Sequence, residues 1–209
     1  PFSPWDGKDY VGLPILLKVS GKCTTDHISP AGPWLRYRGH LDKFSDNMFM
    51  GATNAFDDQI GKTKNIITDQ AEISISNVAR YYKNQGIRWI VVGDYNYGEG
   101  SSREHAALSP RLLGGAAVIA RSFARIHETN LKKQGLLPLT FNSPEEYDLI
   151  NQTDRINLVD LDSISEGVPI KCEISHDDGS VTRISLNHSF GNSQIEWFRA
   201  GSALNLFHQ

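Results

Sequence analysis

A glycine-rich turn with two hydroxyls and a cation is the densest group of chemically active residues in the sequence. It lies between an apolar, β-rich run and a helical pattern, and it reads Gly98-Glu99-Gly100-Ser101-Ser102-Arg103. Open α/β sheets place ligands at this point of the fold. Free N–H groups at a helix start attract anions, and arginine offers a planar fork that suits a carboxylate or phosphate. We therefore predict an anion site here, with Ser101 at the start of the following helix.

Other glycine-rich motifs do not fit this turn. The phosphate loop requires a lysine after its last glycine, but Ser101 follows Gly100. The dinucleotide fingerprint requires a third glycine where Arg103 stands. The hydrolase elbow requires a glycine two residues after its serine, but Glu104 follows Ser102 at that spacing. The simpler alternative, a serine that only caps the next helix, stays open.

A second polar segment, Thr24 to Pro33, is also rich in hydrogen-bonding groups. Asp26 and His27 could form an acid/base pair, or the segment could be a turn with Ser/Thr caps. Beyond it, Arg36 and Arg38 stand beside aromatic residues. They could grip a carboxylate, or they could belong to a solvated face on which arginine stacks on rings.

A third segment, Arg121 to Asn130, contains His127 and Glu128. No second histidine lies four residues from His127, so the zinc-protease spacing is absent. We interpret this segment as a helix packed against the site, with Ser122 as its cap and a structural role for His127.

The two cysteines, Cys23 and Cys172, lie far apart in the sequence, and no Cys-x-x-Cys occurs. A disulfide between them stays open, although we favour a buried, reduced Cys172. Two thiols cannot supply the three or four ligands of a cubane iron–sulfur cluster. We therefore expect this chain to bind no such cluster by itself.

Composition narrows the class of protein. The chain has 209 residues, 39% of them hydrophobic and 22% charged, which suits one sizeable globular domain. The net charge of −3 gives no global field that would recruit nucleic acid or a membrane surface. No apolar run approaches the ~20 residues of a membrane span, and the first residues do not resemble a signal peptide.

Hydrophobic periodicity and the positions of glycine and proline predict the helices and strands that position the candidate site residues. Between a strand at 14–19 and the first helix, the segment 21–69 is expected to be irregular. The remaining expected elements are helices at 74–85, 103–113, 123–134, 144–150 and 194–200, strands at 89–92, 116–120 and 136–141, and a hairpin of 170–175 with 181–186. Pro138 favours an edge or terminal position for its strand. The βαβαβ order predicts parallel pairing, and the tail adds antiparallel strands. We expect one α/β domain with a mixed, partly parallel sheet or barrel flanked by helices.

Taken together, these motifs resemble mitochondrial-type members of the aconitase family, and the resemblance runs from about Trp5 to Asn205. The segments that carry it are Thr24-Thr25-Asp26-His27-Ile28-Ser29-Pro30-Ala31-Gly32, Tyr37-Arg38-Gly39-His40, Gly98-Glu99-Gly100-Ser101-Ser102-Arg103-Glu104-His105 and Ser122-Phe123-Ala124-Arg125-Ile126-His127. The resemblance covers only the last, "swivel" domain of the family. It implies that residues 1–209 form that domain within a larger multidomain enzyme, closing over other domains that hold a [4Fe–4S] cluster.

The resemblance also implies roles by position. Ser101 matches the catalytic base, and Asp26 matches a catalytic acid thought to act with a histidine of another domain. Arg38 and Arg103 match arginines that bind substrate carboxylates, and Ser102 matches a substrate-binding hydroxyl. No metal ligand is assigned to this chain.

The activity that the resemblance implies is a hydro-lyase, which isomerises citrate to isocitrate through cis-aconitate in the tricarboxylic acid cycle. Its setting would be the mitochondrial matrix. The expected partners are these tricarboxylates and the remaining domains of the enzyme, with no nucleic acid and no membrane.

Three alternatives remain. The small subunit of an isopropylmalate or homoaconitase-type isomerase shares this fold at about this length, although Arg38 suits a third carboxylate better than an alkyl group. An RNA-binding module is disfavoured by the net charge of −3. An interaction domain with a vestigial site is disfavoured by the intact set of Ser101, Arg103 and Arg38.

Overall fold

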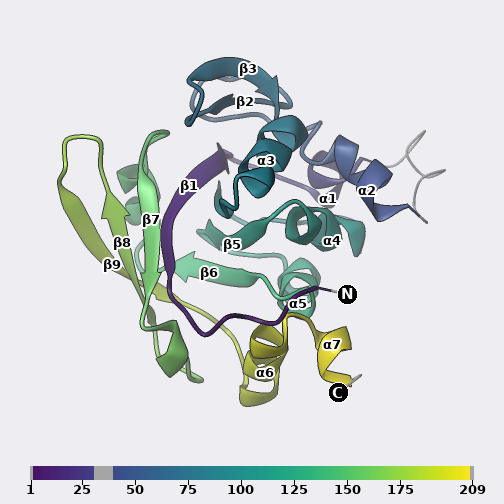
Figure 1. Ribbon diagram of the computed structural model, residues 1–209, viewed down its shortest axis with the longest axis vertical. Coiled ribbons are helices and arrows are strands. Elements are labelled where there is room, and N and C mark those ends of the chain that lie inside the picture. The colour runs from purple at the N-terminus through teal and green to yellow at the C-terminus, as the bar shows by residue number, and fades with distance from the viewer. Residues whose placement is uncertain (1, 31–39, 208–209) are drawn as a thin grey trace.

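The computed structural model describes residues 2–30 and 40–207 and contains a closed, seven-stranded barrel (Figure 1). Its strands follow the order β1-β4-β5-β6-β9-β8-β7. Their bounds are β1 Tyr10–Lys18, β4 Trp89–Gly93, β5 Gly115–Ala120, β6 Leu137–Phe141, β7 Arg155–Val159, β8 Ile170–Ser175 and β9 Val181–Asn187. The expected mixed α/β architecture is confirmed.

The first half of the barrel is parallel. β4 pairs with β1 on one side and with β5 on the other, and β5 pairs with β6, all in parallel. Every residue of β4 and β5 is buried, because the barrel interior covers one face and helices cover the other. Along β4, Ile90 and Val92 join the core inside the barrel, while Trp89 and Val91 join the core beneath the helices.

Helices α3, α4 and α5 precede or connect these strands and pack outside them, and in Figure 1 α4 lies to the right of the barrel and α6 lies below it. The longer helices are α3 Ile75–Asn84, α4 His105–Leu112, α5 Arg125–Lys133 and α6 Asn192–Ala200. Shorter helical turns are α1 Thr25–Ile28, α2 Leu41–Phe44, α7 Ala203–Phe207 and the 3₁₀ turns η2 Ser45–Asn47, η3 Pro144–Leu149 and η4 Leu161–Ser163. None of the helices within the described ranges is long and apolar enough to cross a membrane.

The second half of the barrel is antiparallel. The predicted hairpin is confirmed as β8 and β9, and β7 pairs with β8 and with β1. Burial alternates along β7 and β8, as expected for strands with one face toward solvent. The pairing of β6 with β9 closes the barrel.

The sequence reading missed several elements. The segment expected to be irregular contains β2 Lys62–Asn65, which forms a small hairpin outside the barrel with β3 Gln70–Ser74, directly after that segment. β7 and α7 were not predicted, because each has only five residues and a weak local pattern. Of the two positions predicted for Pro138, edge or terminal, the edge is wrong, since β6 lies between β5 and β9, whereas Pro138 does lie near the N-terminal end of β6. Pro138 is tolerated because β9 pairs only with Thr140 and Phe141.

Candidate functional site

Two loops meet at the carboxyl ends of β1 and β4. The Gly98 N–H donates to the Cys23 carbonyl at 2.9 Å, and the Thr25 N–H donates to the Glu99 carbonyl at 2.9 Å. The Thr25 hydroxyl donates to the Ser101 carbonyl at 2.8 Å. Parallel strands end at the same edge of a sheet, so the fold brings the two polar segments, which are far apart in sequence, into direct contact.

The glycines of the β4 loop are required by this contact. Gly98 has φ +84°, and a Cβ there would lie 2.2 Å from the His127 ring. Gly100 has φ +113°, and a Cβ there would lie 3.2 Å from the Thr25 hydroxyl oxygen. Both positions need the left-handed region that glycine adopts without strain, and Gly98 also needs the absence of a side chain.

A cavity of about 440 Å³ lies at this junction. The β4 loop, the start of α1 and the first turn of α5 all contribute to it. Its polar lining includes Thr25, Ser101, Ser102, Arg103, Arg125 and His127. The structure therefore brings together three of the predicted site residues, Ser101, Ser102 and Arg103, in one pocket.

Asp26 joins this group through Arg103. The Arg103 Nη1 is ion-paired with the Asp26 carboxylate and also donates to the Ser29 carbonyl at 3.0 Å. The Asp26 side chain is 66% exposed and that of Arg103 is 27% exposed. An ion pair this open contributes about 0–1 kcal/mol to stability, so its main effect is to orient the guanidinium.

The segment around Asp26 also shows the predicted cap. Thr24 caps α1 by accepting the His27 N–H at 3.2 Å, and His27 Nδ1 accepts the Thr24 N–H at 3.1 Å. This reciprocal pair confirms the Ser/Thr-cap interpretation of the turn. Arg38, which is predicted to bind a substrate carboxylate, lies outside the described residues, as does Arg36.

The predicted helix starts are wrong. α4 begins at His105, with Glu104 at its N-cap, so Ser101 and Ser102 precede it in an extended loop. The bond from Thr25 to the Ser101 carbonyl holds this loop out of the helix. Likewise α5 has Ala124 rather than Ser122 at its N-cap. Ser122 instead accepts the Asn96 N–H at 2.8 Å, so it holds the β4 loop.

His127 is buried beneath this loop, with 2% of its surface exposed. Its ring packs against Tyr97, and neither ring nitrogen has a hydrogen-bond partner in the part of the chain that the structure describes. Burial lowers the pKa of His127 to about 4, so the imidazole is neutral near pH 7. This placement fits the structural role expected for His127.

Asp94 was not singled out by the sequence reading, although it organises the loops around the cavity. Its carboxylate accepts the Gly21 N–H at 2.7 Å, the Tyr95 N–H at 2.9 Å and Arg121 Nη1 at 2.9 Å. Burial acts to raise the pKa of Asp94, but these hydrogen bonds outweigh it and lower the pKa. The available signal was an aspartate placed directly after a buried strand.

Both cysteines are free and buried. Each is 1% exposed, and burial raises the pKa of each thiol to about 12. Cys23 belongs to the core beneath the helices, whereas Cys172 belongs to the core inside the barrel. Across residues 2–30 and 40–207, no group of three or more His, Cys, Asp or Glu side chains could hold a metal ion.

Comparison with known proteins relates this geometry to a family. Residues 13–144 match the family model described as the aconitase C-terminal domain. The chain is 58% identical over 205 residues to the mitochondrial aconitate hydratase of Gracilaria gracilis and 55% identical to that of Saccharomyces cerevisiae. These alignments cover 98% of this chain but 26% of each relative, so the chain spans about a quarter of their length.

A solved structure shares the fold. The chain resembles a 3-isopropylmalate dehydratase of Methanocaldococcus jannaschii with a TM-score of 0.61 and 24% sequence identity. The match covers 96% of this chain and 93% of that protein. At this level of identity the likeness concerns the architecture of the barrel.

Proposed function

Because this chain belongs to the aconitase C-terminal domain family, we propose that residues 1–209 form the swivel domain of an aconitate hydratase. The whole enzyme would be a hydro-lyase that interconverts citrate and isocitrate through cis-aconitate. This chain would supply the catalytic serine and the substrate-binding arginines, and further domains would supply the rest. Its curated relatives are named as mitochondrial enzymes, which supports a place in the mitochondrial matrix.

The observation that carries this proposal is the cavity of about 440 Å³ that Ser101, Ser102 and Arg103 line together. Its volume lies within the range of small-molecule sites. A tricarboxylate needs more than one cationic fork. Arg103 provides one of them, and Arg38 would provide another by family resemblance. Ser102 would donate a hydrogen bond from its hydroxyl to the bound substrate.

Ser101 would remove the proton from the carbon beside a substrate carboxylate. A neutral hydroxyl is a weak base, so its pKa must fall in the bound complex. The helix start does not account for a lowered pKa of Ser101, because α4 begins four residues later, at His105. The charge of Arg103 and the exposed N–H groups of the glycine-rich loop are the remaining sources of stabilisation. Asp26 would orient Arg103 and act as a site acid.

The family implies a [4Fe–4S] cluster in the full enzyme. The thiols of this chain do not fit it. Cys23 and Cys172 lie in separate cores, and burial raises the pKa of both to about 12, which disfavours the thiolates that the cluster needs. We place the cluster on the other domains.

A substitution in the complete enzyme tests the proposal. Ser101→Ala should lower kcat by at least about 100-fold with a much smaller change in KM, because a base acts chiefly in the transition state. Ser180→Ala, in the exposed turn of the β8–β9 hairpin, is the matched control and should behave as wild type. Equal activity of the two variants would refute the role of Ser101.

The choice of substrate separates this proposal from the isopropylmalate-type alternative, which has the same fold. The complete enzyme should convert citrate and isocitrate and leave isopropylmalate unchanged. Turnover of isopropylmalate without turnover of citrate would assign the chain to the alternative.

A further inference from the structure

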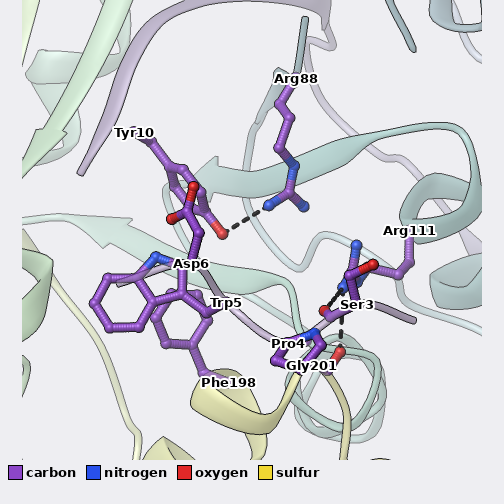
Figure 2. Close-up of a pocket in the computed structure, with 10 residues that line it drawn as sticks. Ser3, Pro4, Trp5, Asp6, Tyr10, Arg88, Arg111, Phe198 and Gly201 are labelled. Atoms are coloured by element: carbon purple, nitrogen blue, oxygen red, sulfur yellow. Dashed lines mark hydrogen bonds between the residues drawn. The ribbon is translucent and has the colours of Figure 1, made fainter. Parts of the chain in front are cut away.

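A second cavity of about 370 Å³ lies at the other end of the parallel strands. Arg88 directly precedes β4, Gly135 lies two residues before β6, and Arg111 lies near the end of α4, before β5. These are the amino ends of the strands, whereas the loops of the candidate site follow the carboxyl ends of β1 and β4. The N-terminal segment and α6 complete the wall of this cavity, as Figure 2 shows.

Arg88 is the first of two cations in this cavity. Its Nη1 donates to the Tyr10 hydroxyl at 2.7 Å, its Nη2 donates to the Gly115 carbonyl at 2.5 Å, and its Nε donates to the Gly114 carbonyl at 3.4 Å. An arginine has five N–H donors, so each Nη of Arg88 keeps one N–H beyond these bonds.

Arg111 is the second cation. Its Nε donates to the Gln134 carbonyl at 2.9 Å, and its Nη2 donates to the carbonyls of Ser3 and Gly201 at 3.2 and 3.3 Å. Its Nη1 donates to no group among residues 2–30 and 40–207. Burial, together with the charge of Arg88, lowers the pKa of Arg111 to about 10, so the Arg111 guanidinium is still positive near pH 7.

The two guanidiniums of this cavity have no ionic partner. Within the described chain, no carboxylate lies within ion-pair distance of Arg88 or Arg111. Two cations without an ionic partner favour an anion as the occupant. The bonded carbonyls at the C-terminal ends of α4, α5 and α6 and the exposed carboxylate of Asp6 oppose this positive charge. This opposing charge favours an occupant with a single negative charge.

The opposite wall of the cavity is aromatic. Trp5 and Phe198 pack with their ring centroids 5.1 Å apart, and Tyr10 meets Phe198 edge-on at 6.3 Å. Figure 2 shows Trp5 and Phe198 on one side and Arg111 on the other, with Tyr10 next to Arg88. Flat apolar groups bind well against such rings. Asp6 lines the cavity as well and is exposed.

We propose that this cavity is a second binding site, for a small carboxylate monoanion attached to a flat apolar group. The carboxylate lies between Arg88 and Arg111 and accepts their remaining N–H groups. The apolar part rests on Trp5, whose ring packs against the buried Phe198. The volume suits a molecule larger than a simple ion.

Calorimetric titration of the 209-residue chain with benzoate tests this site, after a cooperative thermal melt has shown that the sample is folded. Benzoate should bind with a dissociation constant on the order of 1 mM, as expected for so small a ligand. Benzamide has the same shape without the charge, and acetate has the charge without the ring. Both should bind about 10-fold more weakly or not at all.

Variants locate the binding. Arg111→Lys should weaken benzoate binding about 10-fold, because lysine keeps the charge and loses the fork. Trp5→Ala should weaken benzoate and leave acetate unchanged, while Asp6→Asn should tighten benzoate about twofold by removing a like charge. Arg183→Gln, at an exposed ion pair on β9, is the matched control.

The outcomes separate clearly. If Arg111→Lys does not fold, Trp5→Ala and Asp6→Asn decide, since both change side chains at the rim. Benzamide binding as tightly as benzoate, or no response of benzoate binding to Trp5→Ala and Asp6→Asn, overturns the proposal. Loss of benzoate binding in Arg103→Lys would place the ligand in the other cavity and also overturn it. None of these results depends on hydro-lyase activity.

Discussion

At the scale of single residues, the arginines of the chain act through geometry as much as through charge. The Nη1 of Arg103 donates to the Asp26 carboxylate and to the Ser29 carbonyl, so the guanidinium is oriented before a ligand binds. A preset fork loses less side-chain entropy when it binds a carboxylate. A lysine at the same position would carry the charge on a flexible side chain without a planar group.

Replacement of the arginines that we propose to bind substrate should therefore raise KM in the complete enzyme. Arg103→Lys and Arg38→Lys each lose a two-pronged contact worth about 1.5–3 kcal/mol, which is roughly 10- to 150-fold in affinity. Steady-state kinetics with citrate and with isocitrate measure the change, with Arg183→Lys as the control. If Arg38→Lys keeps its KM while Ser101→Ala loses only binding, the two roles have been exchanged.

At the scale of elements, the β4 loop depends on glycine where it crosses α5. Gly98 and Gly179 have nearly the same φ, +84° and +85°, but a Cβ would meet the His127 ring at Gly98 and nothing within 4 Å at Gly179. Alanine at either position introduces backbone strain, but only alanine at position 98 also introduces steric overlap. Comparison of the two substitutions therefore separates the two effects.

Gly98→Ala should destabilise the fold far more than Gly179→Ala. The control should cost about 1–2 kcal/mol through left-handed strain. Gly98→Ala should cost at least about 2 kcal/mol more, since overpacking of a filled core adds about 1–3 kcal/mol. Chemical denaturation measures both. The double variant Gly98→Ala with His127→Ala should recover part of the difference, and equal costs for the two single variants would contradict the contact with His127.

The loops after β1, β4 and β5 form a second element-scale unit, tied together by Asp94. Asp94→Asn removes the charge that holds Arg121 and should destabilise the chain by about 1–3 kcal/mol, because Arg121 then keeps only the longer, 4.0 Å ion pair with the exposed Asp148. Asp160→Asn, which breaks an exposed pair with Lys171, should cost at most about 1 kcal/mol. Denaturant midpoints compare the two, and equal losses would show that Asp94 does not brace the loops.

At the scale of the whole molecule, the barrel is closed by its shortest strand pairing. β6 pairs with β9 at two positions only, Thr140 with Asn187 and Phe141 with Leu186, whereas β8 pairs with β9 at six. Closure leaves no unpaired edge in the barrel. It also encloses one core inside the barrel and a second beneath the helices, and the second core contains the aromatic neighbours of His127.

The stability of the whole chain should depend on pH through His127. The unfolded chain takes up a proton at the ordinary pKa of 6.5, while the folded chain resists protonation down to about 4. The unfolded state thus binds more protons in this window, so stability is full above pH 6.5 and falls as the pH approaches 4. The loss should be roughly 3 kcal/mol.

Denaturation curves at pH 7, 5.5 and 4 measure this loss, with His127→Phe as the comparison. The variant should lose about 3 kcal/mol less across the window. Burial lowers the pKa of His188 in the same direction, so its contribution remains in both proteins and cancels. Parallel curves for the two proteins would show that His127 is not buried in its neutral form.

The sequence by itself determined the elements whose signals are local. The apolar runs of β4 and β5, the hairpin around Gly179 and the cap at Thr24 all depend on residues close to one another in the chain, and so does the run that contains Ser101 and Arg103. The tertiary structure decided the rest. Barrel closure, the pairing of Arg103 with Asp26 and the brace at Asp94 join residues between 27 and 77 positions apart, and no local pattern encodes such contacts. The start of α4 was decided in the same way, since a bond from Thr25, 76 residues away, holds Ser101 outside the helix.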